Sequence, residues 1–230
     1  KAEMQTCIQW LTDPSKGVGV HAEEIIGFRT PFLLYSDKTY VALHDLGFRY
    51  DCTIEDGFQG DRDASSDTWP YTLDHGSPAD GKIGAHAGLW ELPVYPVVVP
   101  PDDKCAQYGV PSGLRAKLMK IDPTFDVSTG KISGLDYNLW IIYRMTKAEF
   151  VATLEYTLDQ HLAGNRAPFM IGAHPDLYSI EPPDDPTPNS TYQDRRAALA
   201  EFLDYALSKP DVRVVPNRVI LDWLRAPVPL

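Results

Sequence analysis

The sequence predicts an α/β fold built on parallel strands. Amphipathic helical segments alternate with short apolar runs, and the last third reads as helix, strand, helix, strand, helix. A strand, a helix and a further strand also follow one another near the beginning, and such a unit implies a parallel pair with a right-handed crossover. The chain has 230 residues, of which 43% are hydrophobic and 11% aromatic. It is therefore long enough to bury a core as one large domain.

The first part of the chain is expected to hold one helix and the strand–helix–strand unit. Lys1–Leu11 carries apolar side chains at helical spacing with no N-cap before it, so the chain is expected to begin inside a helix. Strands are expected at Glu24–Phe32 and Phe48–Ile54. Between them, a helix should begin at a Ser36 cap, turn Tyr40, Leu43 and Leu46 inward, and end at Gly47.

The middle of the chain is expected to be irregular. Glu55–Ala87 is rich in Asp, Gly and Ser and contains aromatic residues, so it is predicted to be a long surface excursion with a functional role. Leu89–Val99 resembles a strand, but two prolines interrupt it, and it must bend or lie at a sheet edge. Pro100–Asp136 is predicted to be a second irregular insertion, with a short helix around Leu114–Lys120.

The clearest helix of the chain begins at the capping box Thr146–Glu149. It presents apolar side chains at successive i+4 steps, and a short apolar run, Phe169–Ile171, follows it. This run has the length and composition of a buried parallel strand, and His174 stands where it stops. Because ligands of α/β folds lie at the carboxyl ends of strands, His174 is a candidate catalytic residue. A structural histidine is the alternative.

The C-terminal segments complete the α/β pattern. Pro175–Asn189, with five prolines and four acidic residues, is expected to be an exposed loop beside the site. The next helix, Tyr192–Ser208, ends before Pro210, and Val212–Val215 is predicted to be the last strand. Asn217 is expected to cap a final helix through Leu224. The apolar side chains that the first of these helices should bury are Leu199, Phe202, Leu203 and Ala206.

Charge and composition exclude several classes of partner. The net charge is −11, and no basic run offsets it, so binding to nucleic acid or to anionic lipid is disfavoured. A polymeric substrate should be neutral or cationic. No apolar run approaches the roughly 20 residues that span a bilayer. The three cysteines, Cys7, Cys52 and Cys105, lack metal-ligand spacing and allow at most one internal disulfide.

Five segments resemble, in order, the polysaccharide deacetylases of carbohydrate esterase family 4. Gly27–Phe32, with a following helix and Leu46–Asp51, is similar to the Arg-x-Pro motif of that family and its continuation. The other four segments resemble the chitin deacetylase-like branch of the family, which is best known from insects. The resemblance implies a deformed β/α barrel, of which residues 1–230 would be the C-terminal part of a single catalytic domain. The other matching segments are Trp69–Asp74, Gly88–Glu91, Asn165–Phe169 with His174, and Leu203 through Leu224.

The resemblance also implies a metal site, and this chain lacks its motifs. The family uses Zn²⁺ or another divalent metal to polarise the attacking water, with ligands from an Asp-Asp pair and a His-x-x-x-His pair. The six histidines of this chain include no pair three to five residues apart. Asp102-Asp103 is flanked by prolines and is predicted to lie in a solvated loop. The metal ligands are therefore expected upstream of Lys1.

The resemblance suggests roles for six residues. His174 matches the general acid near the leaving nitrogen, and Arg29 matches the arginine that orients the catalytic carboxylate. The acidic partner of His174 is left open between the segment at Trp90-Glu91 and the segment that begins at Asp136. The substrate-binding residues would be Trp90 as a wall of the acetyl pocket, Trp69 and Tyr71 as stacking surfaces for sugars, and Phe32.

The expected function is hydrolysis of acetyl groups from N-acetylated glycans, either chitin-like or peptidoglycan-like, by a protein that is secreted or periplasmic. A non-catalytic carbohydrate-binding relative of the same fold is the main alternative. A different α/β hydrolase that uses His174 with a nucleophile is disfavoured, because no Gly-x-Ser-x-Gly elbow is present. The sequence does not indicate the oligomeric state.

Overall fold

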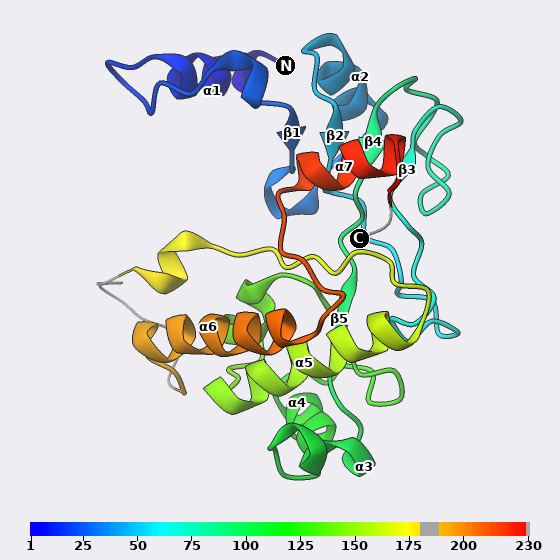
Figure 1. Ribbon diagram of the computed structural model, residues 1–230, viewed down its shortest axis with the longest axis vertical. Coiled ribbons are helices and arrows are strands. Elements are labelled where there is room, and N and C mark those ends of the chain that lie inside the picture. The colour runs from blue at the N-terminus through cyan, green and yellow to red at the C-terminus, as the bar shows by residue number, and fades with distance from the viewer. Residues whose placement is uncertain (180–188, 229–230) are drawn as a thin grey trace. The chain divides into compact units, whose positions relative to one another are not determined.

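The structure is a computed structural model that describes residues 1–179 and 189–228 (Figure 1). The chain is a mixed α/β protein that divides into two compact units, each with its own apolar core. The N-terminal unit comprises Lys1–Asp56 and Thr68–Val94. The C-terminal unit comprises Gly57–Asp67 and Tyr95–Leu230. Most of the predicted loop at Pro175–Asn189 lies outside the described residues.

The N-terminal unit contains a four-stranded sheet in the order β1-β2-β4-β3. β1 and β2 run parallel, β2 and β4 run parallel, and β3 is antiparallel to β4. Because α2 connects β1 to β2, the predicted strand–helix–strand unit is confirmed. The elements are α1 (Ala2–Thr12), η1 (Ala22–Glu24), β1 (Gly27–Phe28), η2 (Pro31–Leu33), α2 (Asp37–Asp45), β2 (Tyr50–Asp51), β3 (Tyr71–Thr72) and β4 (Trp90–Glu91).

The strands of this sheet are only two residues long, so the predicted lengths of Glu24–Phe32 and Phe48–Ile54 were wrong. After β1, the 3₁₀ turn η2 reverses the chain, and Phe32 adopts a left-handed conformation with φ of 57°. After β2, the N–H groups of Thr53 and Ile54 donate to side-chain carboxylates instead of to a neighbouring strand. These captured donors interrupt the ladder, which resumes as a single parallel bridge between Glu55 and Val94.

The helix α2 forms as its sequence predicts. Ser36 and Thr39 form a reciprocal capping box. Tyr40 and Leu43 are fully buried, and the predicted third inward residue, Leu46, is half-buried against the same core. The buried members of this core are Tyr40, Leu43, Phe48, Ile54, Leu73, Ile83 and Leu89.

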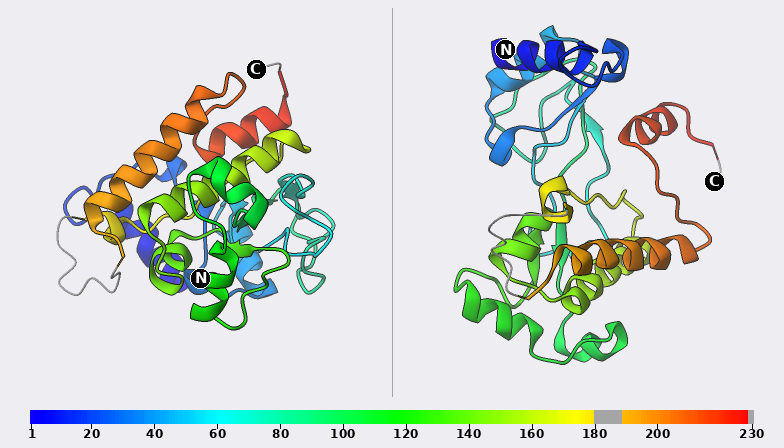
Figure 2. Two further views of the ribbon diagram at one scale, coloured as in Figure 1. Left: turned by 90° about the horizontal axis from the view of Figure 1, so that it is seen from below. Right: turned by 90° about the vertical axis from the view of Figure 1, so that its left-hand side faces the viewer.

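The C-terminal unit is built around two long helices that pack side by side, α5 and α6 (Figure 2). A two-stranded antiparallel sheet of β5 and β6 packs against α5. The elements are β5 (Pro96–Val98), α3 (Asp102–Cys105), η3 (Ala106–Tyr108), α4 (Leu114–Ile121), β6 (Lys131–Ser133), the π-helical turn η4 (Asn138–Ile142), α5 (Lys147–Ala163), η5 (Pro175–Tyr178), α6 (Tyr192–Ser208) and α7 (Asn217–Arg225).

The helix α5 confirms its predicted cap and its apolar face. The Thr146 hydroxyl accepts from the Glu149 N–H, and the Glu149 carboxylate accepts from the Thr146 N–H at 2.9 Å. The predicted apolar positions line up on the core: Phe150, Leu154 and Leu158 are buried, and Leu162 packs at its edge. The predicted short helix in the second insertion is confirmed as α4.

Four predictions for the second half of the chain were wrong. Phe169–Ile171 is extended but is not a strand; a single parallel bridge joins the next residue, Gly172, to Leu135, because the chain after Leu135 turns into a helix. Val212–Val215 forms no strand among the described residues, and Val214 is exposed. Leu203 is also exposed, since the buried stripe of α6 is Arg195, Ala198, Phe202 and Ala206. Finally, α7 begins at Asn217 itself, with Pro216 in the cap position.

The run Leu89–Val99 divides, as its prolines predict, into β4 and β5. Neither sheet closes on itself in the described part of the chain, so the barrel stays a prediction. The excursion Glu55–Ala87 contains one short strand, β3. The insertion Pro100–Asp136 is more regular than predicted, because it contains α3, α4 and β6. None of the described helices combines the length and the apolar character that a bilayer crossing requires.

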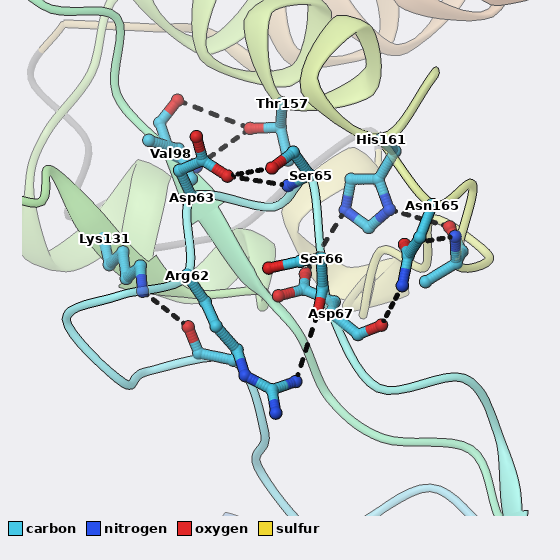
Figure 3. A network of polar contacts seen from close by, with 12 residues as sticks. Arg62, Asp63, Ser65, Ser66, Asp67, Val98, Lys131, Thr157, His161 and Asn165 are labelled. Carbon is cyan, nitrogen blue, oxygen red and sulfur yellow. Dashed lines mark hydrogen bonds and ion pairs between the residues drawn. The ribbon is translucent and has the colours of Figure 1, made fainter. Parts of the chain in front are cut away.

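Residues 57–67 are tied into the C-terminal unit by polar contacts (Figure 3). The ammonium group of Lys131 donates to the carbonyl of Gly57 at 2.7 Å. The Asn165 amide donates to the carbonyl of Asp67 at 2.7 Å, and the backbone N–H of Asn165 donates to the carbonyl of Ser65. Donors on β6 and on the loop after α5 therefore hold this segment in place through its backbone carbonyl groups.

A helix side chain covers the outer edge of β5, and this contact yields a stability prediction. The Val98 N–H donates to the hydroxyl of buried Thr157 at 2.8 Å (Figure 3). Thr157→Val keeps the shape but leaves a buried N–H without its acceptor. We expect the free energy of unfolding, measured by chemical denaturation, to fall by roughly 1–3 kcal/mol. Thr157→Ser keeps the hydroxyl and should cost less. Equal stability of the valine variant and the wild type would contradict the assigned role.

Candidate active site

His174 is placed by a close approach of two backbone segments. The Gly172 N–H donates to the Gly134 carbonyl at 2.9 Å, and the Asp136 N–H donates to the Gly172 carbonyl at 2.8 Å. A side chain at Gly134 would strike the Tyr95 carbonyl oxygen, since an added Cβ would lie 2.2 Å from it. Glycine is thus required there, and the pairing brings His174 beside Asp136.

His174 and Asp136 form a hydrogen-bonded dyad. The imidazole Nδ1 lies 2.6 Å from Asp136 Oδ1, and the backbone N–H of His174 donates to Asp136 Oδ2 at 2.9 Å. Asp136 is fully buried, whereas the His174 side chain is 45% exposed. Because an ionised carboxylate can only accept, Nδ1 carries a proton, and Nε2 is left as the ring atom that a reactant can approach. Such a dyad can act as a general acid or base.

This dyad answers the question that the sequence left open. The acidic partner of His174 is Asp136, not Glu91. Asp136 begins a helical turn that continues into the π-helical turn η4, and π-helical turns are frequent at functional sites.

An exposed aromatic side chain accompanies the dyad. The ring centroid of Tyr137 lies 5.8 Å from that of His174, and Tyr137 is 44% exposed. The motif resemblance assigns no role to Tyr137. Its position directly after Asp136 is the one signal that could have identified it.

Arg29 lies in the N-terminal unit, directly after β1. It is half-buried, and its Nε donates to the carbonyl of Cys52 at 2.7 Å. The next residue, Thr30, donates its N–H to the hydroxyl of Thr53 at 3.0 Å. The segment that carries Arg29 is therefore bound along the residues that follow β2.

A buried pair of acids supports this segment from β2 and β4. Asp51 and Glu91 are paired in register on neighbouring parallel strands, and both are fully buried. Glu91 Oε1 accepts from the N–H groups of Thr53 and Ile54, and Asp51 accepts from the Thr53 hydroxyl. The Tyr40 hydroxyl donates to Asp51 Oδ2 at 3.1 Å.

Both carboxyl groups of the acid pair are harder to ionise than a free carboxyl group. Burial raises the pKa of Asp51 to about 6, and burial together with the negative charge of Asp51 raises the pKa of Glu91 well above its usual range. Glu91 Oε2 is buried and meets no hydrogen-bond partner from the described residues.

The four predicted substrate-binding aromatics all belong to the N-terminal unit. Phe32 is 91% exposed and so presents its ring to solvent. Trp69, Tyr71 and Trp90 are half-buried. The Tyr71 hydroxyl hydrogen-bonds to Ser77 six residues away, so Tyr71 at least helps to anchor its own loop.

The described residues contain no candidate metal site. Within 1–179 and 189–228, no group of three or more His, Cys, Asp and Glu side chains could hold a metal ion. Asp102 and Asp103 are exposed at the start of α3, a short helix instead of the predicted loop. The three cysteines are free thiols.

His161 illustrates the structural alternative for a histidine. It is fully buried in α5, and its Nδ1 donates to the carbonyl of Ala167 at 2.7 Å. Its Nε2 lies 3.7 Å from Asp67 Oδ2 (Figure 3). Burial lowers the pKa of His161. Its ring is therefore enclosed, unlike that of His174.

Comparison with known proteins gives one informative relative. No family model matches the chain. The chain is 24% identical over 234 residues to chitin deacetylase 8 of Bombyx mori, and the alignment covers 100% of this chain and 52% of that protein. The chain thus spans about half the length of the curated relative that it matches. This similarity supports the resemblance of the motifs, at the level of a polysaccharide deacetylase-like relative.

The acid pair predicts an unusual dependence of stability on pH. Because both pKa values are raised by folding, the folded state binds more protons than the unfolded state, whose acids titrate near about 4. The contribution of the pair to stability is therefore complete below about pH 4, and it falls as the pH rises through about 6, where Asp51 ionises, and further as Glu91 ionises.

Glu91→Gln tests this dependence. A glutamine amide has nearly the same shape as the carboxyl group and keeps an oxygen acceptor, but it does not titrate. We expect the variant to lose less stability than the wild type between about pH 5 and pH 8 in denaturant unfolding. The matched control is Glu3→Gln at an exposed position of α1, which should keep the wild-type dependence. An identical pH dependence in Glu91→Gln and the wild type would contradict the raised pKa of Glu91.

Proposed function

We propose that this chain is part of the catalytic domain of a hydrolase that removes acetyl groups from N-acetylated glycans. The observation that carries the proposal is the dyad of exposed His174 and buried Asp136. The similarity to a protein named chitin deacetylase supports it from a second side. The substrate would be a chitin-like or peptidoglycan-like glycan. Such a glycan need not be negatively charged, so the net charge of −11 on this chain would not repel it.

His174 would act at the leaving group. Hydrolysis of an acetamide expels an amine, which must gain a proton to leave. The Asp136 carboxylate holds Nδ1 and stabilises the imidazolium, so Nε2 would deliver the proton. The exposed ring of Tyr137 beside His174 would offer a surface for a sugar ring.

Arg29 would orient the carboxylate that activates the water. Its Nε is occupied by the Cys52 carbonyl, which fixes the plane of the guanidinium group. Phe32, Trp69, Tyr71 and Trp90 remain the proposed substrate contacts, and the exposed ring of Phe32 is the most accessible of them. The deformed barrel and a secreted or periplasmic location also stay predictions.

The described residues offer no cluster of side chains that could hold a metal ion. Zinc or another divalent ion, with ligands upstream of Lys1, stays a prediction of the resemblance. The alternative is a non-catalytic carbohydrate-binding relative. The next experiment would favour it if the wild type binds the glycan but releases no acetate.

The direct test is acetate release from N-acetylated chitooligosaccharides by the complete protein that contains this chain. His174→Ala should lower turnover by roughly 10²–10⁴, the range typical of a lost general acid. His75→Ala, at an exposed histidine, is the control and should keep full activity. Near-normal turnover in His174→Ala would remove His174 from the mechanism. Binding of the oligosaccharide without any acetate release by the wild type would favour the binding-module alternative.

Arg29→Lys should not be a conservative change. A lysine ammonium cannot donate to the Cys52 carbonyl and at the same time present a planar fork to a carboxylate. We therefore expect a clear loss of acetate release with little change in the free energy of unfolding. Arg49→Lys, at an exposed position just before β2, is the matched control. Full activity of Arg29→Lys would show that Arg29 is only structural.

A further inference from the structure

The hydrogen-bond ladder between β1 and β2 continues beyond the ends of the two strands. Phe28 is paired with Asp51, so the next pair in the same register is Arg29 with Cys52. The Cys52 N–H donates to the Phe28 carbonyl at 2.9 Å, as a parallel ladder requires. In a regular ladder, the bond that follows joins the Thr30 N–H to the Cys52 carbonyl.

Two side chains replace this next backbone bond. The Thr30 N–H donates to the hydroxyl of Thr53 at 3.0 Å. The Cys52 carbonyl accepts from Nε of Arg29 at 2.7 Å. The threonine hydroxyl thus takes the backbone donor of one strand, and the guanidinium group binds the carbonyl that this donor would have used.

The Thr53 hydroxyl is held in the orientation that this exchange needs. It donates to Oδ1 of Asp51 at 2.9 Å, so its oxygen can accept from Thr30. The Thr53 N–H donates to Oδ2 of Asp51 at 3.0 Å and to Oε1 of Glu91 at 3.1 Å. Thr53 is fully buried, and its branched Cβ restricts rotation about χ1. The hydroxyl is therefore a fixed acceptor for the Thr30 N–H.

We infer that Thr53 is a positioning residue for Arg29, because its hydroxyl leaves the Cys52 carbonyl to the guanidinium group. A guanidinium group whose Nε is bound to the backbone keeps one plane, which is what bidentate binding of a carboxylate needs. The motif resemblance assigns no role to Thr53. The expected effect on catalysis rests on the proposed function of Arg29, whereas the hydrogen bonding does not.

The first test needs no activity and begins with the wild type. In the labelled complete protein, exchange of the Arg29 Nε–H with water is followed by NMR, and the signal is assigned by its loss in Arg29→Lys. This proton should exchange at least roughly 10-fold more slowly than the Nε–H of Arg49, which lies at an exposed position. Equal exchange rates of the two protons would overturn the inference without any further variant.

Thr53→Val keeps the shape of the side chain but removes the hydroxyl. The Thr30 N–H then needs another acceptor, and the regular ladder offers the Cys52 carbonyl. Competition for this carbonyl should speed the exchange of the Arg29 Nε–H. Thr53→Ser keeps the hydroxyl and should keep the protection. Undiminished protection in Thr53→Val would overturn the inference.

Thr12→Val is the matched control, because it removes a hydroxyl that donates to the Ile8 carbonyl within α1 of the same unit. It should leave the exchange of the Arg29 Nε–H unchanged. If Thr53→Val does not fold, Thr53→Ala is measured in its place and is held to the same outcome.

The second test measures acetate release. Thr53→Val should lower kcat by roughly 2- to 10-fold, the equivalent of one hydrogen bond, at an unchanged KM, and Thr53→Ser should keep the wild-type kcat. Full activity of Thr53→Val, when Arg29→Lys has lost activity, would also overturn the inference. If the protection depends on Thr53 while Arg29→Lys stays fully active or the wild type releases no acetate, the positioning by Thr53 stands and the proposed function fails.

Discussion

A carboxylate taken out of water must be surrounded by hydrogen-bond donors or must hold a proton, and both units of this chain meet that constraint. In the C-terminal unit, Asp136 accepts from the backbone N–H and the ring Nδ1–H of His174. In the N-terminal unit, burial raises the pKa values of Asp51 and Glu91, and the pair accepts from Tyr40, Thr53 and Ile54. The nearby backbone adapts to these contacts, because an N–H group that donates to a carboxylate cannot also donate to a neighbouring strand.

The short strands of the N-terminal unit are thus a consequence of its acid pair. The register that aligns Asp51 with Glu91 brings the two carboxyl groups together on parallel strands. The N–H groups that follow β2 then turn toward these carboxyl groups, and the Thr53 hydroxyl links the pair to Thr30, the neighbour of Arg29. A buried pair of acids therefore lies two hydrogen bonds away from the segment that carries a proposed functional arginine.

Two histidines of the C-terminal unit show how the same side chain is used in different ways. His161 is enclosed, and its donating nitrogen is bound by a backbone carbonyl, so its ring serves the structure. His174 gives its Nδ1 to a buried carboxylate and leaves the rest of its ring accessible. Both residues are histidines, and they differ in the group that binds Nδ1 and in the solvent exposure of the ring. The second arrangement is the one that proton transfer requires.

Much of the helical structure could be predicted from the sequence, because a helix depends on neighbours within a few residues. The capping boxes at Ser36 and Thr146 and the apolar face of α5 were determined by the sequence alone. So was the placement of His174 at the end of an extended run. The tertiary structure decided what depends on distant partners: the shortness of β1 and β2, the absence of a strand at Val212–Val215 and the exposure of Leu203. It also decided that Asp136, 38 residues away in the sequence, is the partner of His174, because backbone pairing between Gly134 and Gly172 brings them together and no local pattern encodes that contact.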